Sequence, residues 1–223
     1  MGTSLFREPF SYAHRALEQK AGYTIDADDW HADVHGRLRY AEHLSHDAEL
    51  RNMLVSLPQY HAGRLFIFTN ADDKHADACL TALGIRDLFP KAHVLTFETL
   101  QRCAVQRGLP PSQVLCKPQP EAFQVVLDLI GARAQRTLFL DDSTRNVAGA
   151  ASIGIHAVLV GASEPCPGAI ASVLDVRHLH AAVPRLWYAH ATEAPAEDGD
   201  VAAALEADEL EAHTTREAIE VES

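Results

Sequence analysis

The sequence lacks several features that would assign the chain to a well-defined class of protein. It has no run of about 18 consecutive apolar residues, so we expect no membrane-spanning helix and no membrane partner. It has neither a glycine-rich dinucleotide fingerprint nor a Walker-type phosphate loop. Only 19 lysines and arginines stand against 31 aspartates and glutamates, which argues against a nucleic acid partner.

Cysteine is also scarce. The 223 residues include four cysteines, at positions 79, 103, 116 and 166, and no two of them form a Cys-x-x-Cys pair or a spacing typical of metal ligands. Such cysteines are typical of reduced thiols in an intracellular protein, so we expect a cytoplasmic location.

The negative charge is concentrated at one end. Residues 190–223 contain 11 acidic residues and one basic residue, whereas residues 1–189 contain 20 acidic and 18 basic residues. We therefore expect a nearly neutral folded body followed by a solvated acidic tail. A tail that docks on a basic partner is an alternative interpretation.

Hydrophobic periodicity predicts that helices and strands alternate along the body. The expected helices are 47–57, 74–83, 120–130 and 146–153, and the expected strands are 64–69, 93–96, 137–140 and a last one at 156–160. The polar segment 101–112 is interpreted as a loop because it contains Gly108, Pro110 and Pro111. Short links between strands and helices favour a parallel sheet covered by helices on both faces.

Polar side chains occur at three places that should meet at one edge of the expected sheet. Thr69 and Asn70 end one strand, Lys117 stands just before a helix, and Asp141 and Asp142 end another strand. A hydroxyl, a cation and two carboxylates together suit a phosphate group and Mg²⁺. Taken singly, each also has an ordinary explanation, as a cap, a surface lysine or the start of a helix.

Three segments resemble the haloacid dehalogenase-like hydrolases, and more closely their pyrimidine 5′-nucleotidase branch. They are Phe66-Ile-Phe-Thr-Asn-Ala-Asp72, Cys116-Lys-Pro-Gln-Pro-Glu-Ala-Phe123 and Leu138-Phe-Leu-Asp-Asp-Ser-Thr-Arg-Asn146. The resemblance implies an α/β fold with a Rossmann-like three-layer parallel sheet. It divides the chain into a helical cap remnant (1–60), a hydrolase core (61–189) and the acidic tail (190–223).

The resemblance also implies a function and a role for each site residue. The function is Mg²⁺-dependent hydrolysis of a small phosphate monoester, with a nucleoside 5′-monophosphate as the suspected substrate. Thr69 resembles the hydroxyl residue that holds the phosphoryl group, with Asn70 beside it in the substrate site. Lys117 resembles the catalytic cation that orients the nucleophile and binds phosphate, and Asp141 and Asp142 resemble the carboxylates that position Mg²⁺. Asn146 stands where some members have a further metal-shell residue.

The family's nucleophile is missing from its expected place. Those enzymes begin with an apolar strand that ends in Asp-x-Asp-x-Thr or Val, whose first Asp attacks phosphorus. Here the Asp26-Ala-Asp28 sequence is followed by Trp30, and we interpret it as a helix start or turn.

In the family the missing strand lies between the strands that here end at Thr69 and Asp141. These two strands should therefore close up, leave a gap or pair with another segment. We expect the sequence to be truncated and nearly inactive. The alternative is a non-catalytic protein that binds phosphate or nucleotide, or has a regulatory role.

Overall fold

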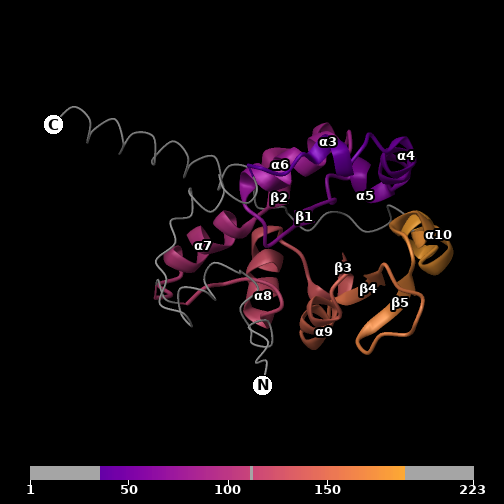
Figure 1. The fold of residues 1–223 in the computed structure, drawn as a ribbon. Coiled ribbons are helices and arrows are strands. Elements are labelled where there is room, and N and C mark those ends of the chain that lie inside the picture. Colours follow the sequence, from indigo (N-terminus) through magenta and orange to yellow (C-terminus); the bar gives the residue numbers. More distant parts are fainter. Residues whose placement is uncertain (1–35, 111–112, 189–223) are drawn as a thin grey trace, which may run out of the picture.

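A computed structural model describes residues 36–110 and 113–188 of the chain (Figure 1). The Asp26-Ala-Asp28 sequence and the acidic tail lie outside these residues. Within the described ranges, no helix is long and apolar enough to cross a membrane.

Helices and short parallel strands alternate along the described chain. The helices are α3 (Tyr40–His43), α4 (Ala48–Ser56), α5 (Pro58–His61), α6 (Asp73–Ala82), α7 (Phe97–Gln106), α8 (Pro120–Leu129), α9 (Thr144–Ser152), α10 (Leu179–Ala182) and α11 (Arg185–Tyr188). The strands are β1 (Ile67–Phe68), β2 (Val94–Leu95), β3 (Leu138–Asp141), β4 (His156–Val160) and β5 (Ala169–Val173). Short 3₁₀ helices are η2 (Arg86–Leu88), η3 (Lys91–His93), η4 (Ala134–Arg136) and η5 (Val176–His178). Every helix and strand predicted from periodicity is confirmed, although β1 is shorter than expected.

Two of the sequence predictions are wrong. Residues 101–106 of the segment predicted as a loop belong to α7, whereas residues 107–110 are outside any helix or strand. Thr96 caps the start of α7, and its side chain accepts a hydrogen bond from the Thr99 N–H. Leu100 and Cys103 form the buried side of this helix, and its other positions are mostly polar. The strand at 156–160 is not the last, because β5 follows it at the sheet edge. The alanines and the serine of β5 gave a weak hydrophobic signal.

The strands form two separate parallel sheets. β1 pairs with β2, and β3, β4 and β5 form the second sheet in that order. Within the described residues no ladder joins β1 to β3. Of the three outcomes expected for these strands, the described residues therefore show a gap.

Helices cover both faces of each sheet, which confirms the predicted three-layer arrangement. On the second sheet, α8 and α9 pack on one face around Val147 and Leu159, and α10 and α11 pack on the other face around Leu179 and Val158. On the first sheet, α7 and α8 pack on one face, and α4, α5 and α6 pack on the other. The class is therefore α/β with a Rossmann-like arrangement (Figure 1).

Contacts on both faces hold the two sheets together across the gap. On one face, α8 packs Val126 in the cluster of the first sheet and Phe123 in the cluster of the second. The Phe123 ring lies edge-on to Phe68 of β1, at 5.6 Å between centroids, and to Phe139 of β3, at 5.1 Å. On the opposite face, Trp187 Nε1 donates a hydrogen bond of 3.0 Å to Ser56 Oγ.

The position of Phe123 predicts a large loss of stability when its ring is removed. The side chain is 1% exposed and packs against aromatic rings from both sheets. Phe123→Ala should lower the free energy of unfolding by about 3–5 kcal/mol, measured by urea denaturation. Val105→Ala, at a residue that is 67% exposed, is the control and should change it by less than about 0.5 kcal/mol. A similar small change for both variants would contradict this role.

Candidate functional site

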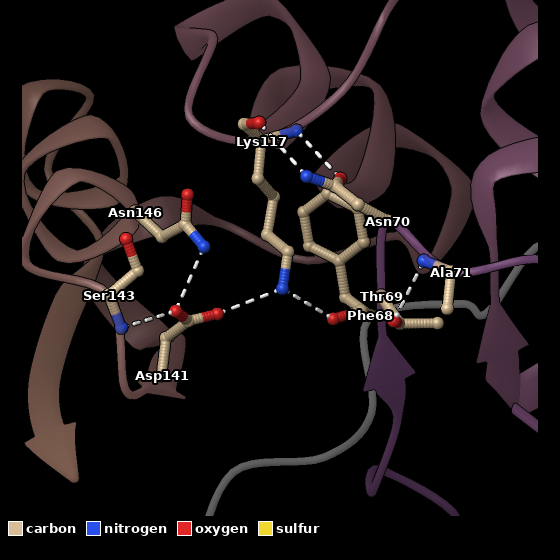
Figure 2. Close-up of polar contacts among 8 residues, drawn as sticks. All are labelled: Phe68, Thr69, Asn70, Ala71, Lys117, Asp141, Ser143 and Asn146. Carbon is tan, nitrogen blue, oxygen red and sulfur yellow. Dashed lines mark hydrogen bonds and ion pairs between the residues drawn. The ribbon is translucent and has the colours of Figure 1, made fainter. Parts of the chain in front are cut away.

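Three segments meet at the carboxyl edges of the two sheets. They are residues 68–71 at the end of β1, residues 115–119 before α8, and residues 141–146, which run from the end of β3 into the first turn of α9. Figure 2 shows the Lys117 side chain extended between the end of β1 and the end of β3. Lys117, Thr69, Asn70 and Asp141, all predicted from the sequence, are brought together here.

The Lys117 ammonium group is buried and contacts both sheets. Lys117 is 7% exposed, and its Nζ donates hydrogen bonds of 2.8 Å to the Phe68 carbonyl oxygen and 2.8 Å to Asp141 Oδ2. Nζ also lies 4.9 Å from the centre of the Phe68 ring and 5.3 Å from that of Phe139. Ring faces attract a cation, so both rings help to hold the ammonium group in this position.

Asp141 is the partner that makes this buried charge tolerable. Its side chain is 6% exposed. Oδ1 accepts 2.9 Å hydrogen bonds from the Ser143 N–H and from Asn146 Nδ2, and Oδ2 accepts the bond from Lys117. A carboxylate has about four lone-pair positions, so these three donors leave one acceptor position on Asp141. Asp142, by contrast, is exposed to solvent.

Thr69 and Asn70 make different contacts. Thr69 Oγ1 accepts a 3.0 Å hydrogen bond from the Ala71 N–H, which leaves its hydroxyl proton able to serve as a donor. Asn70 Oδ1 accepts the Lys117 N–H at 2.9 Å, and Asn70 Nδ2 donates to the Lys117 carbonyl oxygen at 3.0 Å. Asn70 therefore contacts the lysine backbone, and Thr69 presents a hydroxyl at the same edge (Figure 2).

Close packing places α9 against the segment that carries Lys117. A Cβ atom at Gly149 would lie 2.2 Å from the Pro118 carbonyl oxygen and 3.0 Å from the Phe123 ring. Only glycine lets the α9 backbone approach this closely. The approach brings Asn146, one turn earlier on the same helix, to Asp141.

The acidic residues after Asn70 have structural roles. Asp72 Oδ1 accepts the His75 N–H at 2.6 Å and caps α6. The Thr96 hydroxyl donates a hydrogen bond to Asp73. Burial raises the pKa of the nearby Glu98 carboxyl, and the negative charges of Asp73 and Asp72 raise it further.

The donors at this edge fit a hydrated magnesium ion. Within the described ranges, no three or more histidine, cysteine, aspartate or glutamate side chains are arranged so that they could together hold a metal ion. Magnesium commonly keeps several waters and takes only one or two carboxylates from the protein. One acceptor position on Asp141 and the exposed carboxylate of Asp142 can supply that number.

Sequence reasoning missed the aromatic part of the site. Phe68 and Phe139 place their rings beside the Lys117 ammonium, and Phe68 also supplies its carbonyl oxygen. Both residues were recognised only as apolar positions in strands. A backbone acceptor and two ring faces have no residue signature in a sequence.

The chain belongs to the haloacid dehalogenase-like hydrolase family, whose model matches residues 5–154. It is 28% identical over 138 residues to Phosphate metabolism protein 8 of Saccharomyces cerevisiae, covering 60% of this chain and 40% of that protein. It is 36% identical over 70 residues to mouse Acyl-CoA dehydrogenase family member 10, covering 31% of this chain and 6% of that protein. The chain therefore spans less than half the length of these curated relatives.

Solved structures similar to this chain include two proteins of related description. One is a predicted phosphoglycolate phosphatase from Haemophilus somnus, with 21% identity, a TM-score of 0.46, and coverage of 75% of this chain and 73% of that one. The other is a hydrolase of the same family from Deinococcus radiodurans with bound phosphate and sodium, with 18% identity, a TM-score of 0.48, and coverage of 76% and 72%.

The buried pair predicts that removing either charge alone destabilises the protein. Lys117→Met leaves Asp141 buried without its cation and should lower the free energy of unfolding by about 3–5 kcal/mol in urea denaturation. The double variant Lys117→Met/Asp141→Asn should lose less than the sum of the two single variants, because neither charge is then left alone. Additive losses would contradict a coupled pair.

The raised pKa of Glu98 predicts a pH-dependent gain of stability in Glu98→Gln. The side chain is partly buried and one of its oxygens has no hydrogen-bond partner. Because its folded pKa lies above the unfolded value, the stability it contributes at low pH is lost as pH rises. Glu98→Gln should therefore exceed the wild type in unfolding free energy at neutral pH, and the difference should shrink toward about pH 4. Glu164→Gln, at an exposed residue, is the matched control.

Proposed function

We propose that Lys117 and Thr69 bind the phosphate group of a small phosphate monoester, as the phosphate subsite of a magnesium-dependent phosphohydrolase. The observation that carries the proposal is the buried Lys117 ammonium, held by Phe68 and Asp141 beside a threonine hydroxyl. Family membership supports the same reaction class.

The lysine has one donor left for a ligand. An ammonium group has three N–H donors, and two of them are directed to the Phe68 carbonyl oxygen and to Asp141. The third can donate to a phosphate oxygen, and the Thr69 hydroxyl can donate to another. The attraction between the cation and phosphate is strengthened because the surroundings of Nζ exclude water.

Magnesium is the proposed cofactor, with Asp141 and Asp142 as the carboxylates that would hold it. Bound there, it would neutralise part of the phosphate charge and help to orient the ester. Among the described residues, Asp141 would orient both the metal and Lys117, and Asn146 and Ser143 would hold Asp141 in place. A nucleoside 5′-monophosphate is the proposed substrate.

We expect hydrolysis by this chain to be very slow. No Asp-x-Asp-x-Thr or Asp-x-Asp-x-Val sequence follows a strongly apolar strand in it, and uncatalysed phosphate-ester hydrolysis is among the slowest of biological reactions. Robust Mg²⁺-dependent hydrolysis of a nucleoside monophosphate that Asp26→Ala abolishes would contradict this expectation. It would identify Asp26 as the nucleophile.

The second candidate function is binding or regulation without turnover. Two features of the described edge favour it. Lys117 and Thr69 can donate hydrogen bonds to phosphate, and the Asp141 carboxylate already accepts three hydrogen bonds. This function predicts Mg²⁺-dependent binding of phosphate or nucleotide with no product formed after long incubation. Release of phosphate at an enzymatic rate would contradict it.

Calorimetric titration with inorganic phosphate tests the phosphate subsite. The wild type should bind phosphate in the presence of Mg²⁺, and Lys117→Met should weaken that binding by roughly 10–100-fold, the value of a charge-assisted hydrogen bond. Lys91→Met is the matched control, because Lys91 is exposed and lies before β2. Equal affinities for the wild type and Lys117→Met would contradict the proposal.

A further inference from the structure

The segment that carries Lys117 has no strand or helix to fix it. Residues 113–119 lie between α7 and α8 and belong to neither element. Yet Leu115, Cys116 and Lys117 are all buried. Buried backbone N–H and C=O groups outside regular structure must find other partners.

Three side-chain carboxamides supply most of those partners, one carboxamide for each residue, and the Gln119 backbone N–H donates to the Cys116 carbonyl oxygen at 3.0 Å. Gln101 of α7 accepts the Leu115 N–H at 3.3 Å and donates to the Leu115 carbonyl oxygen at 2.6 Å. Gln119 accepts the Cys116 N–H at 3.0 Å. Asn70 accepts the Lys117 N–H at 2.9 Å and donates to the Lys117 carbonyl oxygen at 3.0 Å. We call Asn70, Gln101 and Gln119 the carboxamide cradle.

The chemistry of these contacts requires a carboxamide. Asn70 and Gln101 each bond to both the N–H and the C=O of one residue, as a neighbouring strand would do. Only a side chain with one acceptor and one donor side by side can make this pair of bonds, and an aspartate or glutamate cannot donate. The cradle therefore takes the place of a sheet partner for residues 115–117.

The end of β1 holds Lys117 at two points. Asn70 fixes its backbone, and the Phe68 carbonyl oxygen and ring hold its ammonium group (Figure 2). These two contacts hold the Lys117 side chain in an extended conformation, so that the position of its backbone determines the position of its ammonium group. A change at Asn70 or Gln101 would move the ammonium without removing it.

We infer that the carboxamide cradle consists of positioning residues, which act through the backbone of residues 115–117 to deliver the Lys117 ammonium to phosphate. This inference deepens the proposed function and rests on it for the identity of the ligand. Gln101 is the informative member, because it bonds to Leu115 and reaches Lys117 only through the chain. Asn70, in this account, acts on phosphate through Lys117.

The test combines phosphate affinity with the state of Lys117 before any ligand is added. The variants are Asn70→Ala, Asn70→Asp, Gln101→Ala and Gln101→Glu, and the conservative Asp and Glu variants keep the shape and one acceptor. Asn52→Ala, on the exposed side of α4, is the matched control. Amide hydrogen exchange and the ammonium signal of Lys117 are measured by NMR, and inorganic phosphate is titrated with Mg²⁺ present.

All four cradle variants should speed hydrogen exchange in residues 115–117 and shift the Lys117 ammonium signal in the free protein, whereas the control should do neither. Phosphate affinity should fall about tenfold in Asn70→Ala and severalfold in Gln101→Ala. In a Lys117→Met background neither change should weaken phosphate further, because both act through the lysine. If Asn70→Ala still weakens phosphate binding in that background, Asn70 contacts phosphate directly, and the inference is overturned.

The two proposals fail in different ways. If the wild type binds no phosphate, the proposed function fails, and the measurements on the free protein still test the cradle. If the Lys117 amide and ammonium signals are the same in the wild type, Asn70→Asp and Gln101→Glu, the cradle does not position Lys117 and the inference is overturned.

Discussion

The contact on which the described structure most depends is the buried ion pair between Lys117 and Asp141. It joins the ends of β1 and β3, which lie in separate sheets. Two buried charges are tolerated only when they are paired and their remaining hydrogen-bonding groups are satisfied. Ser143, Asn146 and the Phe68 carbonyl oxygen meet that condition. The same few contacts therefore fix the geometry of the site and help to hold the two sheets together.

Apolar packing also joins the two sheets of the described chain. Phe123 lies on α8, which begins three residues after Lys117, and its ring contacts Phe68 and Phe139, whose faces also attract the Lys117 ammonium. The same aromatic side chains thus serve the core and the site. Changes in this cluster should affect stability and ligand binding together, as expected where packing is dense and adjusts little.

Sequence patterns predicted the fold where a segment had one clear periodicity. Helices such as α8 and strands such as β4 have clean apolar patterns, but α7 was missed because its buried side uses Thr99 and Cys103 among polar residues. Asn70, Lys117 and Asp141 could be predicted as neighbours because parallel strands end at a common edge. The cradle could not, because Gln101 contacts a segment 14 residues away and was assigned to a loop. Such contacts arise only after α7 and α8 pack together.

An NMR titration of the lysine ammonium groups with inorganic phosphate in the presence of Mg²⁺ tests directly whether Lys117 binds phosphate. If Lys117 binds phosphate, its signal should shift saturably as phosphate is added, and the signals of Lys74 and Lys91 should not follow it. A Lys117 signal that stays unchanged at high phosphate concentration, or one that moves together with those of the other lysines, would contradict the assignment of a phosphate site to this buried ammonium.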